Sequence, residues 1–251
     1  MRLGAVVVLM AFVVLPRSGR AETITVAAAS SLTNAMREIG QAFSRANPGT
    51  VVRFTFGSSG TLLQQIRQGA PIDVFAPASP QEMEVLIRNG DLIGETRTEF
   101  AGNRLVLIGP VGTPLQDWAD LKRETVRRVA LSDPASVPSG RYARETLIRR
   151  GLWNAVRPKG VFGGNVRQTL TYVANGDAAA GIVFATDAGI EPRVTVVAHA
   201  RPGKDHLAIV YPAAVVRRSR HSNLARRFAA FLKSQPAQVI LRRFGFSPPP
   251  D

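Results

Sequence analysis

Short apolar segments alternate with amphipathic helical patterns in the first third of this chain. The segment 23–29 is apolar or β-branched, and a helical pattern follows it at once, with apolar residues at spacings of three and four from Leu32 to Phe43. The alternating segment 51–56 leads in the same way into a helical pattern that begins at Thr61. This repeated change of period predicts β-α units, which are typical of a parallel, doubly wound sheet.

The same alternation continues to the end of the chain. Further strands are expected at 72–76, 103–110, 128–131, 161–166, 179–184, 194–197 and 207–216. Further helices are expected at 81–88, 118–127, 142–150, 167–175, 223–233 and 237–244. No segment is long enough to be a linker between independent domains, and no period of 20 to 50 residues recurs. The sequence therefore predicts an α/β protein.

We expect two lobes with a cleft between them. The chain would leave the first lobe near Gly102 and return near Val210, with Tyr211-Pro212 as a candidate hinge in the returning strand. Lobe 1 would then comprise 22–101 plus 210–251, and lobe 2 would comprise 102–209. Two crossings of the chain would join the lobes.

Serines stand where the first two strands end and the helices begin. Ser30 and Ser31 occupy the first junction, and Gly57-Ser58-Ser59-Gly60 occupies the second. A helix start carries unpaired N–H groups and the positive end of the helix dipole, so it suits an anion. If the two strands are parallel neighbours, both junctions open at the carboxyl edge of the sheet, where open α/β sheets bind ligands. The alternative is that these serines are ordinary helix caps.

Two later loops have a similar character. The loop 132–140 is rich in Ser, Pro and Gly, and Gly163-Gly164-Asn165 precedes the helix expected over 167–175. The nucleotide-binding patterns GxGxxG and GxxxxGK[ST] are both absent from the sequence. Four helix starts could therefore point into the cleft.

Composition places the chain among proteins with a substantial core. It has 251 residues, 45% of them hydrophobic, and a mean hydropathy of +0.03. It contains no cysteine, which excludes a disulfide scaffold, a thiolate metal site and a cysteine nucleophile.

The first residues are typical of a secretory signal peptide. Arg2 precedes the apolar run Leu3–Leu15, which is too short for a bilayer that needs about 20 residues. Gly19 and Ala21 are the small residues before the expected cleavage site. We therefore expect residues 1–21 to be a signal peptide and the mature protein to be exported; an uncleaved anchor is the alternative.

The chain is strongly basic, with a formal net charge of +14. Its arginines are dispersed, often in pairs at expected helix ends such as Arg149-Arg150 and Arg242-Arg243, where cations complement the helix dipole. No basic run carries interleaved aromatic residues of the kind that stack on bases. We therefore expect no nucleic-acid partner, and the charge would at most steer anions toward the surface.

Catalysis is the weaker hypothesis for the cleft. A serine hydrolase built from Ser59, His206 and Asp187 is conceivable, but the segment 57–60 does not fit G-x-S-x-G. Acidic residues and histidines do not cluster at metal-ligand spacing. The four junctions offer hydroxyl and N–H donors without a carboxylate base, which favours a fully deprotonated, compact anion such as a tetrahedral oxyanion. We therefore predict a binding protein and not an enzyme.

The sequence also resembles the periplasmic molybdate-binding proteins of ABC importers. The motifs are AAASSLTNAM (27–36), FGSSGTLLQQI (56–66), GAPIDVFAPAS (69–79), SDPASVPSGRYARETL (132–147), NVRQTL (165–170), GIVFATDA (181–188) and IVYPAAVV (209–216). The resemblance implies a type II periplasmic binding fold whose lobes close on molybdate or tungstate. It also implies a membrane permease as partner; we expect a monomer without a resident cofactor, in which molybdenum enters only as the oxyanion.

The resemblance also implies which residues bind the oxyanion. The two serine ligands match Ser31 and Ser59, and the two backbone donors match Ser139 and Val166. The fifth ligand of the family is a tyrosine, and here position 184 is Phe184. This departure removes one hydroxyl donor to a charged ligand, worth about 1.5 to 3 kcal/mol if nothing replaces it.

The sequence leaves two questions open: which group replaces the missing hydroxyl, and which other ligand or function the same fold could serve. A water, Tyr142 or Tyr172 could replace the missing hydroxyl. The same fold could be tuned to another tetrahedral oxyanion, such as sulfate or phosphate. It could also form the effector-binding part of a transcription regulator, but the expected signal peptide occupies the place of a DNA-binding module.

Overall fold

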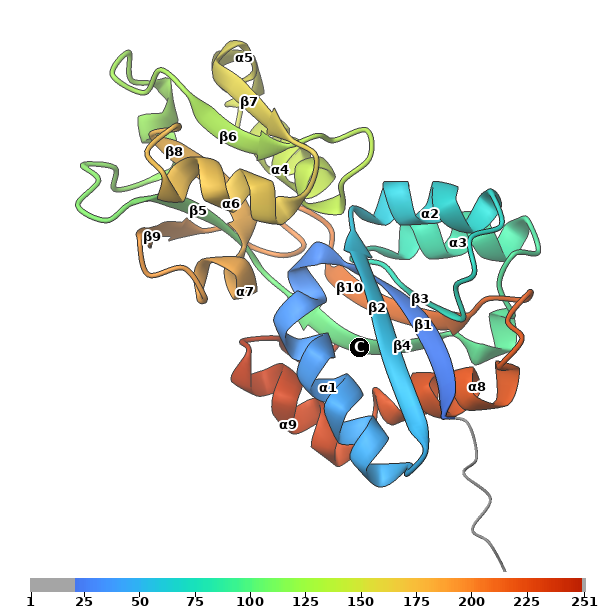
Figure 1. The fold of residues 1–251 in the computed structure, drawn as a ribbon. Coiled ribbons are helices and arrows are strands. Elements are labelled where there is room, and N and C mark those ends of the chain that lie inside the picture. The colour runs from blue at the N-terminus through green and yellow to red at the C-terminus, as the bar shows by residue number, and fades with distance from the viewer. Residues whose placement is uncertain (1–20, 250–251) are drawn as a thin grey trace, which may run out of the picture.

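The protein consists of two lobes, each built around a five-stranded mixed sheet with helices packed on it (Figure 1). The structure is a computed structural model that describes residues 21–249. The strand order is β2-β1-β3-β10-β4 in the first sheet and β7-β6-β8-β5-β9 in the second. The predicted α/β class with two lobes is confirmed. The expected signal peptide falls almost entirely outside the described residues.

The first lobe takes its elements from both ends of the described chain. Its strands are β1 (Glu22–Ala29), β2 (Thr50–Gly57), β3 (Val74–Ala76), β4 (Thr98–Asn103) and β10 (Ile209–Val215). Its helices are η1 (Ser30–Leu32), α1 (Thr33–Ala46), α2 (Ser59–Arg67), α3 (Pro80–Arg88), η2 (Gly94–Thr96), α8 (Ser222–Phe231) and α9 (Gln235–Arg243). Strands β2, β1 and β3 are parallel, and β10 runs against both β3 and β4.

The second lobe repeats this arrangement with the middle of the chain. Its strands are β5 (Leu105–Pro110), β6 (Val129–Ser132), β7 (Gly160–Gly163), β8 (Ala180–Phe184) and β9 (Val194–His199). Its helices are η3 (Trp118–Lys122), α4 (Pro138–Arg149), α5 (Trp153–Val156), η4 (Arg157–Lys159), α6 (Val166–Ala174) and α7 (Ala185–Ala188). Strands β7, β6 and β8 are parallel, and β5 runs against β8 and β9.

The register of the parallel strands brings the helix starts together. Ala29 at the end of β1 pairs with Gly57 at the end of β2, so the first two serine junctions lie side by side. In the second lobe, Ser132 at the end of β6 pairs with Gly163 at the end of β7. The carboxyl ends of β1 and β2 point toward the second lobe (Figure 1). The predicted neighbourhood of the junctions is therefore confirmed.

Two segments carry the chain between the lobes. It passes from β4 to β5 through Arg104 and returns along the segment between β9 and β10. Strand β10 is entirely buried, and its pairing with β4 shifts register between Tyr211 and Pro212. A proline cannot donate to the ladder, which accounts for an irregularity at this point.

The structure departs from the expected elements most clearly at 118–127, at β4 and at the start of α4. The helix expected over 118–127 is only the 3₁₀ segment η3, because beyond it just Val126 is buried and no apolar face remains to pack. Strand β4 was not predicted, because its polar ends and Gly102 leave only Phe100 and Ala101 as apolar residues, which is too short a run to indicate a strand. Helix α4 begins at Pro138 and not at Tyr142, because proline suits the first turn of a helix.

Aromatic rings from different helices pack together in the core of the first lobe. The Phe43 ring on α1 packs edge-on against Phe228 on α8, with 5.2 Å between ring centroids, and against Phe231 at 5.4 Å. A smaller apolar cluster lies under α2 and α3. Over residues 21–249, we find no helix of the length and apolar character needed to span a membrane.

Candidate functional site

A small cavity lies where helix starts from the two lobes meet. Its lining residues are Ala29, Ser30, Ser31, Gly57, Ser58, Ser59, Ala78, Val137, Pro138, Ser139, Asn165, Val166 and Phe184. Its empty volume is about 200 Å³. The four residues that the resemblance implies as ligands therefore lie around one cavity, together with Phe184, which stands where the family has its tyrosine ligand. That they bind a ligand stays a prediction.

Backbone N–H groups face the cavity because the helices begin at it. The first N–H groups of a helix have no partner within the helix. In α6, the Asn165 side chain accepts from the N–H groups of Arg167 and Gln168, which leaves the N–H of Val166. In α4, Pro138 has no N–H, so Ser139 carries the first free donor.

The neighbouring serines Ser58 and Ser59 have different tasks. Ser58 Oγ accepts from the N–H of Thr61 and donates to Thr61 Oγ1 over 2.8 Å, so its hydroxyl is used as a helix cap. Ser59 Oγ accepts from the N–H of Ala78 over 3.0 Å. The Ser59 hydroxyl hydrogen is therefore still available to a ligand. At this junction one serine is an ordinary helix cap, whereas the hydroxyl hydrogen of the other has no partner in the part of the protein that the structure describes; that Ser59 binds an anion stays a prediction.

The first junction is held differently from the second. No side-chain cap bond forms at the start of η1, and Ser31 Oγ instead lies 3.0 Å from the hydroxyl of Tyr211. Tyr211 Oη in turn accepts from Asn103 Nδ2 over 3.0 Å. Neither Tyr211 nor Asn103 was predicted from the sequence as a site residue. What could have indicated them is that Asn103 and Tyr211 are polar residues close to the two positions where the chain was expected to cross between the lobes.

Ser139 offers its backbone and not its side chain. Ser139 Oγ lies 2.8 Å from Ser132 Oγ, which also lies 2.9 Å from Thr169 Oγ1. All three hydroxyl-bearing residues are fully buried. This internal network fixes the start of α4 against β6 and α6, so the N–H of Ser139 is held in a constant direction.

Phe184 closes one side of the cavity with an apolar ring. It is 1% exposed, and its ring lies between Tyr142 at 6.4 Å and Tyr211 at 6.1 Å, measured between centroids. Burial raises the pKa of the Tyr142 hydroxyl to about 12. The Tyr172 hydroxyl accepts from Gln168 Nε2 over 2.9 Å. Neither Tyr142 nor Tyr172 lines the cavity, so the structure gives no support to either as the replacement donor.

The cavity is neutral, although charges lie behind it. Among the described residues that line it, none carries a formal charge. Asp187 on α7 is fully buried, and its carboxylate lies 2.5 Å from Nε of Arg167, directly after Val166. Burial raises the pKa of Asp187 to about 6, which outweighs the lowering by the Arg167 guanidinium. An anion in the cavity would therefore meet oriented dipoles and not an opposite charge.

The raised pKa of Asp187 predicts a pH dependence of stability. Because the folded-state pKa lies above the ordinary value of 3.8, the stabilisation by protonated Asp187 is fully present below about pH 4 and is lost as pH rises through about 6. The expected loss is on the order of 2 kcal/mol. Urea unfolding between pH 4 and 7 should show this decline in the wild type and a flatter profile in Asp187→Asn. Parallel profiles of the two proteins would contradict the assignment of this pH dependence to Asp187.

The two lobes touch across the cleft beside the cavity. The N–H of Gly60 on α2 donates to the carbonyl oxygen of Ser136 in the second lobe over 3.0 Å. Arg141 on α4 forms an ion pair with the buried Glu82 on α3, with 2.5 Å between Nη2 and Oε1. These contacts hold the lobes in a closed arrangement. We expect a ligand to enter before these contacts form.

The candidate hydrolase residues are not arranged for catalysis. His206 Nδ1 contacts the carbonyl oxygen of the adjacent Leu207 over 2.6 Å, and burial lowers its pKa. Asp187 is paired with Arg167. Neither His206 nor Asp187 lines the cavity that contains Ser59. The geometry therefore gives no support to a Ser-His-Asp triad.

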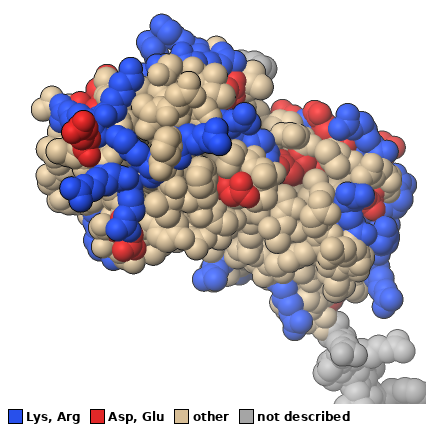
Figure 2. All heavy atoms as spheres, turned by 90° about the horizontal axis from the view of Figure 1, so that it is seen from above, with Lys and Arg blue, Asp and Glu red and all other residues tan. Residues whose placement is uncertain are grey.

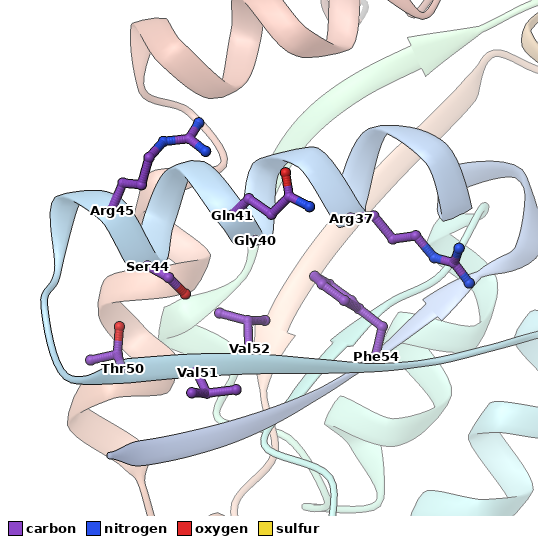
Figure 3. A pocket seen from close by; sticks show the side chains of 9 residues that line it. All are labelled: Arg37, Gly40, Gln41, Ser44, Arg45, Thr50, Val51, Val52 and Phe54. Carbon is purple, nitrogen blue, oxygen red and sulfur yellow. The ribbon is translucent and has the colours of Figure 1, made fainter.

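A larger hollow on the outer face of the first lobe has a different character. Its empty volume is about 930 Å³, and it lies between α1 and β2, with Arg37 and Arg45 near its two ends (Figure 3). No helix starts there. A Cβ atom at Gly40 would lie 2.7 Å from the Phe54 ring, so this glycine permits the close packing of α1 on β2.

Basic side chains are spread over both lobes. On the face seen in Figure 2, Lys and Arg are interspersed with Asp and Glu, and much of the surface is uncharged. Over the described part of the chain, no group of three or more His, Asp or Glu side chains could hold a metal ion. The candidate site is therefore the small cavity, which serines and helix starts from both lobes line.

Comparison with known proteins identifies the class. Residues 24–247 match the family model described as bacterial extracellular solute-binding protein. The chain is 37% identical to the molybdate-binding protein ModA of Escherichia coli over 231 residues, which cover 89% of this chain and 88% of that protein. It is 36% identical to the ModA protein of Haemophilus influenzae over 230 residues, 89% of each chain.

A solved structure agrees with these sequence matches. The periplasmic molybdate-binding protein of Azotobacter vinelandii superposes with a TM-score of 0.79 at 25% identity, covering 90% of this chain and 100% of that chain. The chain therefore belongs to the bacterial extracellular solute-binding proteins and, within them, to the ModA family. Members of this class are binding proteins of ABC transporters and not enzymes, as the sequence analysis predicted.

Proposed function

We propose that this chain captures molybdate in the cavity between its lobes and delivers it to the membrane permease of an ABC transporter. The observation that carries the proposal is the convergence of Ser31, Ser59, Ser139 and Val166 on one neutral cavity at helix starts from both lobes. Hydroxyl and N–H donors at such positions stabilise a dianion without a counter-ion. The names of the ModA relatives support the same ligand.

The character of the donors favours an oxyanion without a proton. Molybdate, tungstate and sulfate accept from every donor, whereas hydrogenphosphate needs an acceptor for its own hydrogen. Tungstate has the shape and charge of molybdate and is included in the proposal. Cavity size would separate these two from the smaller sulfate ion.

The proposal extends to location and partners. Residues 1–21 would act as a secretory signal peptide, and the mature protein would act in the periplasm. It would act as a monomer that docks on the permease, without a resident cofactor and without binding nucleic acid. Molybdenum would reach the protein only within the oxyanion.

Thermal unfolding with separate anions tests this function. A ligand at 100 times its Kd stabilises by about 2.7 kcal/mol. For a chain of this size, that free energy raises Tm by roughly 5 to 10 °C. We expect this rise with molybdate and tungstate but not with sulfate or phosphate. A rise with sulfate or phosphate alone would move the proposal to another oxyanion, and no rise with any of them would reject it.

Phe184→Tyr should tighten molybdate binding by about tenfold, because a hydroxyl would be added at the wall of the cavity. Calorimetric titration of both proteins with molybdate measures the change. Tyr172→Phe, which alters a phenol outside the cavity, serves as the control and should bind like the wild type. An unchanged affinity for Phe184→Tyr would mean that another donor already serves that part of the ligand.

A further inference from the structure

A chain of hydrogen bonds connects the crossing segment of the protein with the cavity. It begins at the backbone N–H of Arg104, which donates to Asn103 Oδ1 over 2.8 Å. Asn103 Nδ2 donates to Tyr211 Oη over 3.0 Å, and Tyr211 Oη lies 3.0 Å from Ser31 Oγ. Asn103, Tyr211 and Ser31 are 6%, 0% and 3% exposed, so water does not compete for these bonds.

The donors and acceptors along this chain can be assigned from chemistry. A backbone N–H can only donate, so the amide oxygen of Asn103 must face Arg104 and its NH₂ group must face Tyr211. The Tyr211 oxygen accepts that bond, and its own hydrogen needs an acceptor, because a buried hydroxyl without one is costly. Ser31 Oγ lies at the right distance to accept it. The hydrogen of Ser31 is then left for the cavity.

The opposite orientation would be unfavourable. If Ser31 donated to Tyr211, the phenol oxygen would accept two hydrogen bonds, one from Asn103 and one from Ser31. The fully buried Tyr211 hydrogen would then lose its acceptor on Ser31. Ser31 can therefore turn its hydrogen away from a ligand only at a cost. Burial also raises the pKa of Tyr211 well above its usual range, so the phenol keeps the hydrogen that it donates.

We propose that Tyr211 is a positioning residue that fixes the Ser31 hydroxyl as a donor into the cavity and thereby selects oxyanions that carry no proton. The proposal rests on the function proposed above. Tyr211 does not line the cavity, although its ring packs 6.1 Å from that of Phe184, so it acts on the ligand through Ser31. A ligand with its own O–H would find at Ser31 a hydrogen facing its hydrogen.

The same chain of hydrogen bonds includes the second lobe. Asn103 Nδ2 also donates to Thr186 Oγ1 on α7 over 2.9 Å. The Asn103 amide is thus held by groups on both sides of the crossing segment. The position of Asn103 therefore depends on how the two lobes are arranged. Through Tyr211, the orientation of the Ser31 hydroxyl depends on that arrangement as well.

A double-mutant cycle tests whether Tyr211 acts through Ser31. Calorimetric titration with molybdate is carried out on the wild type, Tyr211→Phe, Ser31→Ala and the double variant. We expect Tyr211→Phe to weaken binding about fivefold when Ser31 is present. In the Ser31→Ala background it should cause no further loss, because the hydroxyl that it orients is gone. Equal losses in both backgrounds would overturn the proposal.

A selectivity measurement separates positioning from a structural role. In Tyr211→Phe the Ser31 hydroxyl is free to rotate and to accept, so phosphate should compete with molybdate more effectively than in the wild type. A general loosening of the site would weaken both anions alike, and that result would contradict the proposal. Tyr172→Phe is the control phenol outside the cavity and should change neither value.

Two further measurements keep the test decisive. Thermal unfolding without ligand shows whether each variant is folded. Asn103→Asp replaces the donor to Tyr211 by an acceptor, so the phenol would donate to it and accept from Ser31, which turns the Ser31 hydrogen away from the cavity. This variant should therefore reproduce the loss of selectivity even if Tyr211→Phe does not fold. If the wild type binds no molybdate at all, the proposed function fails. If it binds molybdate and the cycle is additive, only the role of Tyr211 fails.

Discussion

Gly60→Ala should weaken molybdate binding by about 100-fold and leave the unliganded protein at least as stable as the wild type. A Cβ atom at this position would lie 2.6 Å from the carbonyl oxygen of Ser136 and 3.0 Å from its Cα atom, both in the facing lobe. The lobes could not then reach the closed arrangement, and the Gly60 N–H would lose its acceptor. Overpacking of this kind costs about 1 to 3 kcal/mol, to which the lost hydrogen bond adds about 1 kcal/mol.

The two effects of this substitution have opposite signs. Alanine is the better helix former by about 0.5 to 1 kcal/mol, and Gly60 lies within α2. We therefore expect a higher or unchanged free energy of unfolding, measured with urea, and a weaker affinity for molybdate, measured by calorimetry. The matched control is Gly94→Ala, whose Cβ would meet only Ile87 at 3.5 Å and should not change binding. Wild-type affinity in Gly60→Ala would show that closure at this contact is not required.

Ser59→Ala and Ser58→Ala should affect different properties although the residues are adjacent. Ser59→Ala removes a hydroxyl donor to the anion, worth about 1.5 to 3 kcal/mol, and leaves the Ala78 N–H without its acceptor. We expect molybdate binding to weaken by about 100-fold. Ser58→Ala removes the cap of α2 and should lower the free energy of unfolding by about 1 kcal/mol with little change in affinity.

Measuring both properties for both variants makes this comparison strict. Calorimetry gives the affinity for molybdate, and urea unfolding without ligand gives the stability. Loss of affinity in Ser58→Ala and none in Ser59→Ala would mean that the hydroxyl roles inferred from the hydrogen bonds are interchanged. Equal losses in both would point to a general disturbance of the start of α2.

Much of the site could be predicted because it depends on local chemistry. The strand-to-helix junctions at Ser31 and Ser59 follow from a change in hydrophobic period, and their pairing follows from the order of parallel strands. The resemblance added the positions of Ser139 and Val166, which the start of α4 and the cap at Asn165 place at the cavity. Departure from the family at Phe184 was also visible from the sequence.

The rest depends on contacts between residues far apart in the chain. Ser31 and Tyr211 are separated by 180 positions, and no local pattern indicates that their hydroxyls meet. Tyr211 was considered only as a hinge candidate, and Tyr142 and Tyr172 were considered as donors instead. The requirement for glycine at position 60 arises from Ser136 in the other lobe, because an alanine would suit the helix itself better.

The most direct test is a crystal structure of the mature protein grown with tungstate, whose strong anomalous scattering locates the bound metal atom. The account predicts a single strong peak in the cavity between the lobes, with oxyanion oxygens at hydrogen-bonding distance from Ser31 Oγ, Ser59 Oγ and the N–H groups of Ser139 and Val166. A peak at the basic surface, in the hollow between α1 and β2, or in the cavity but away from these four donors would contradict it.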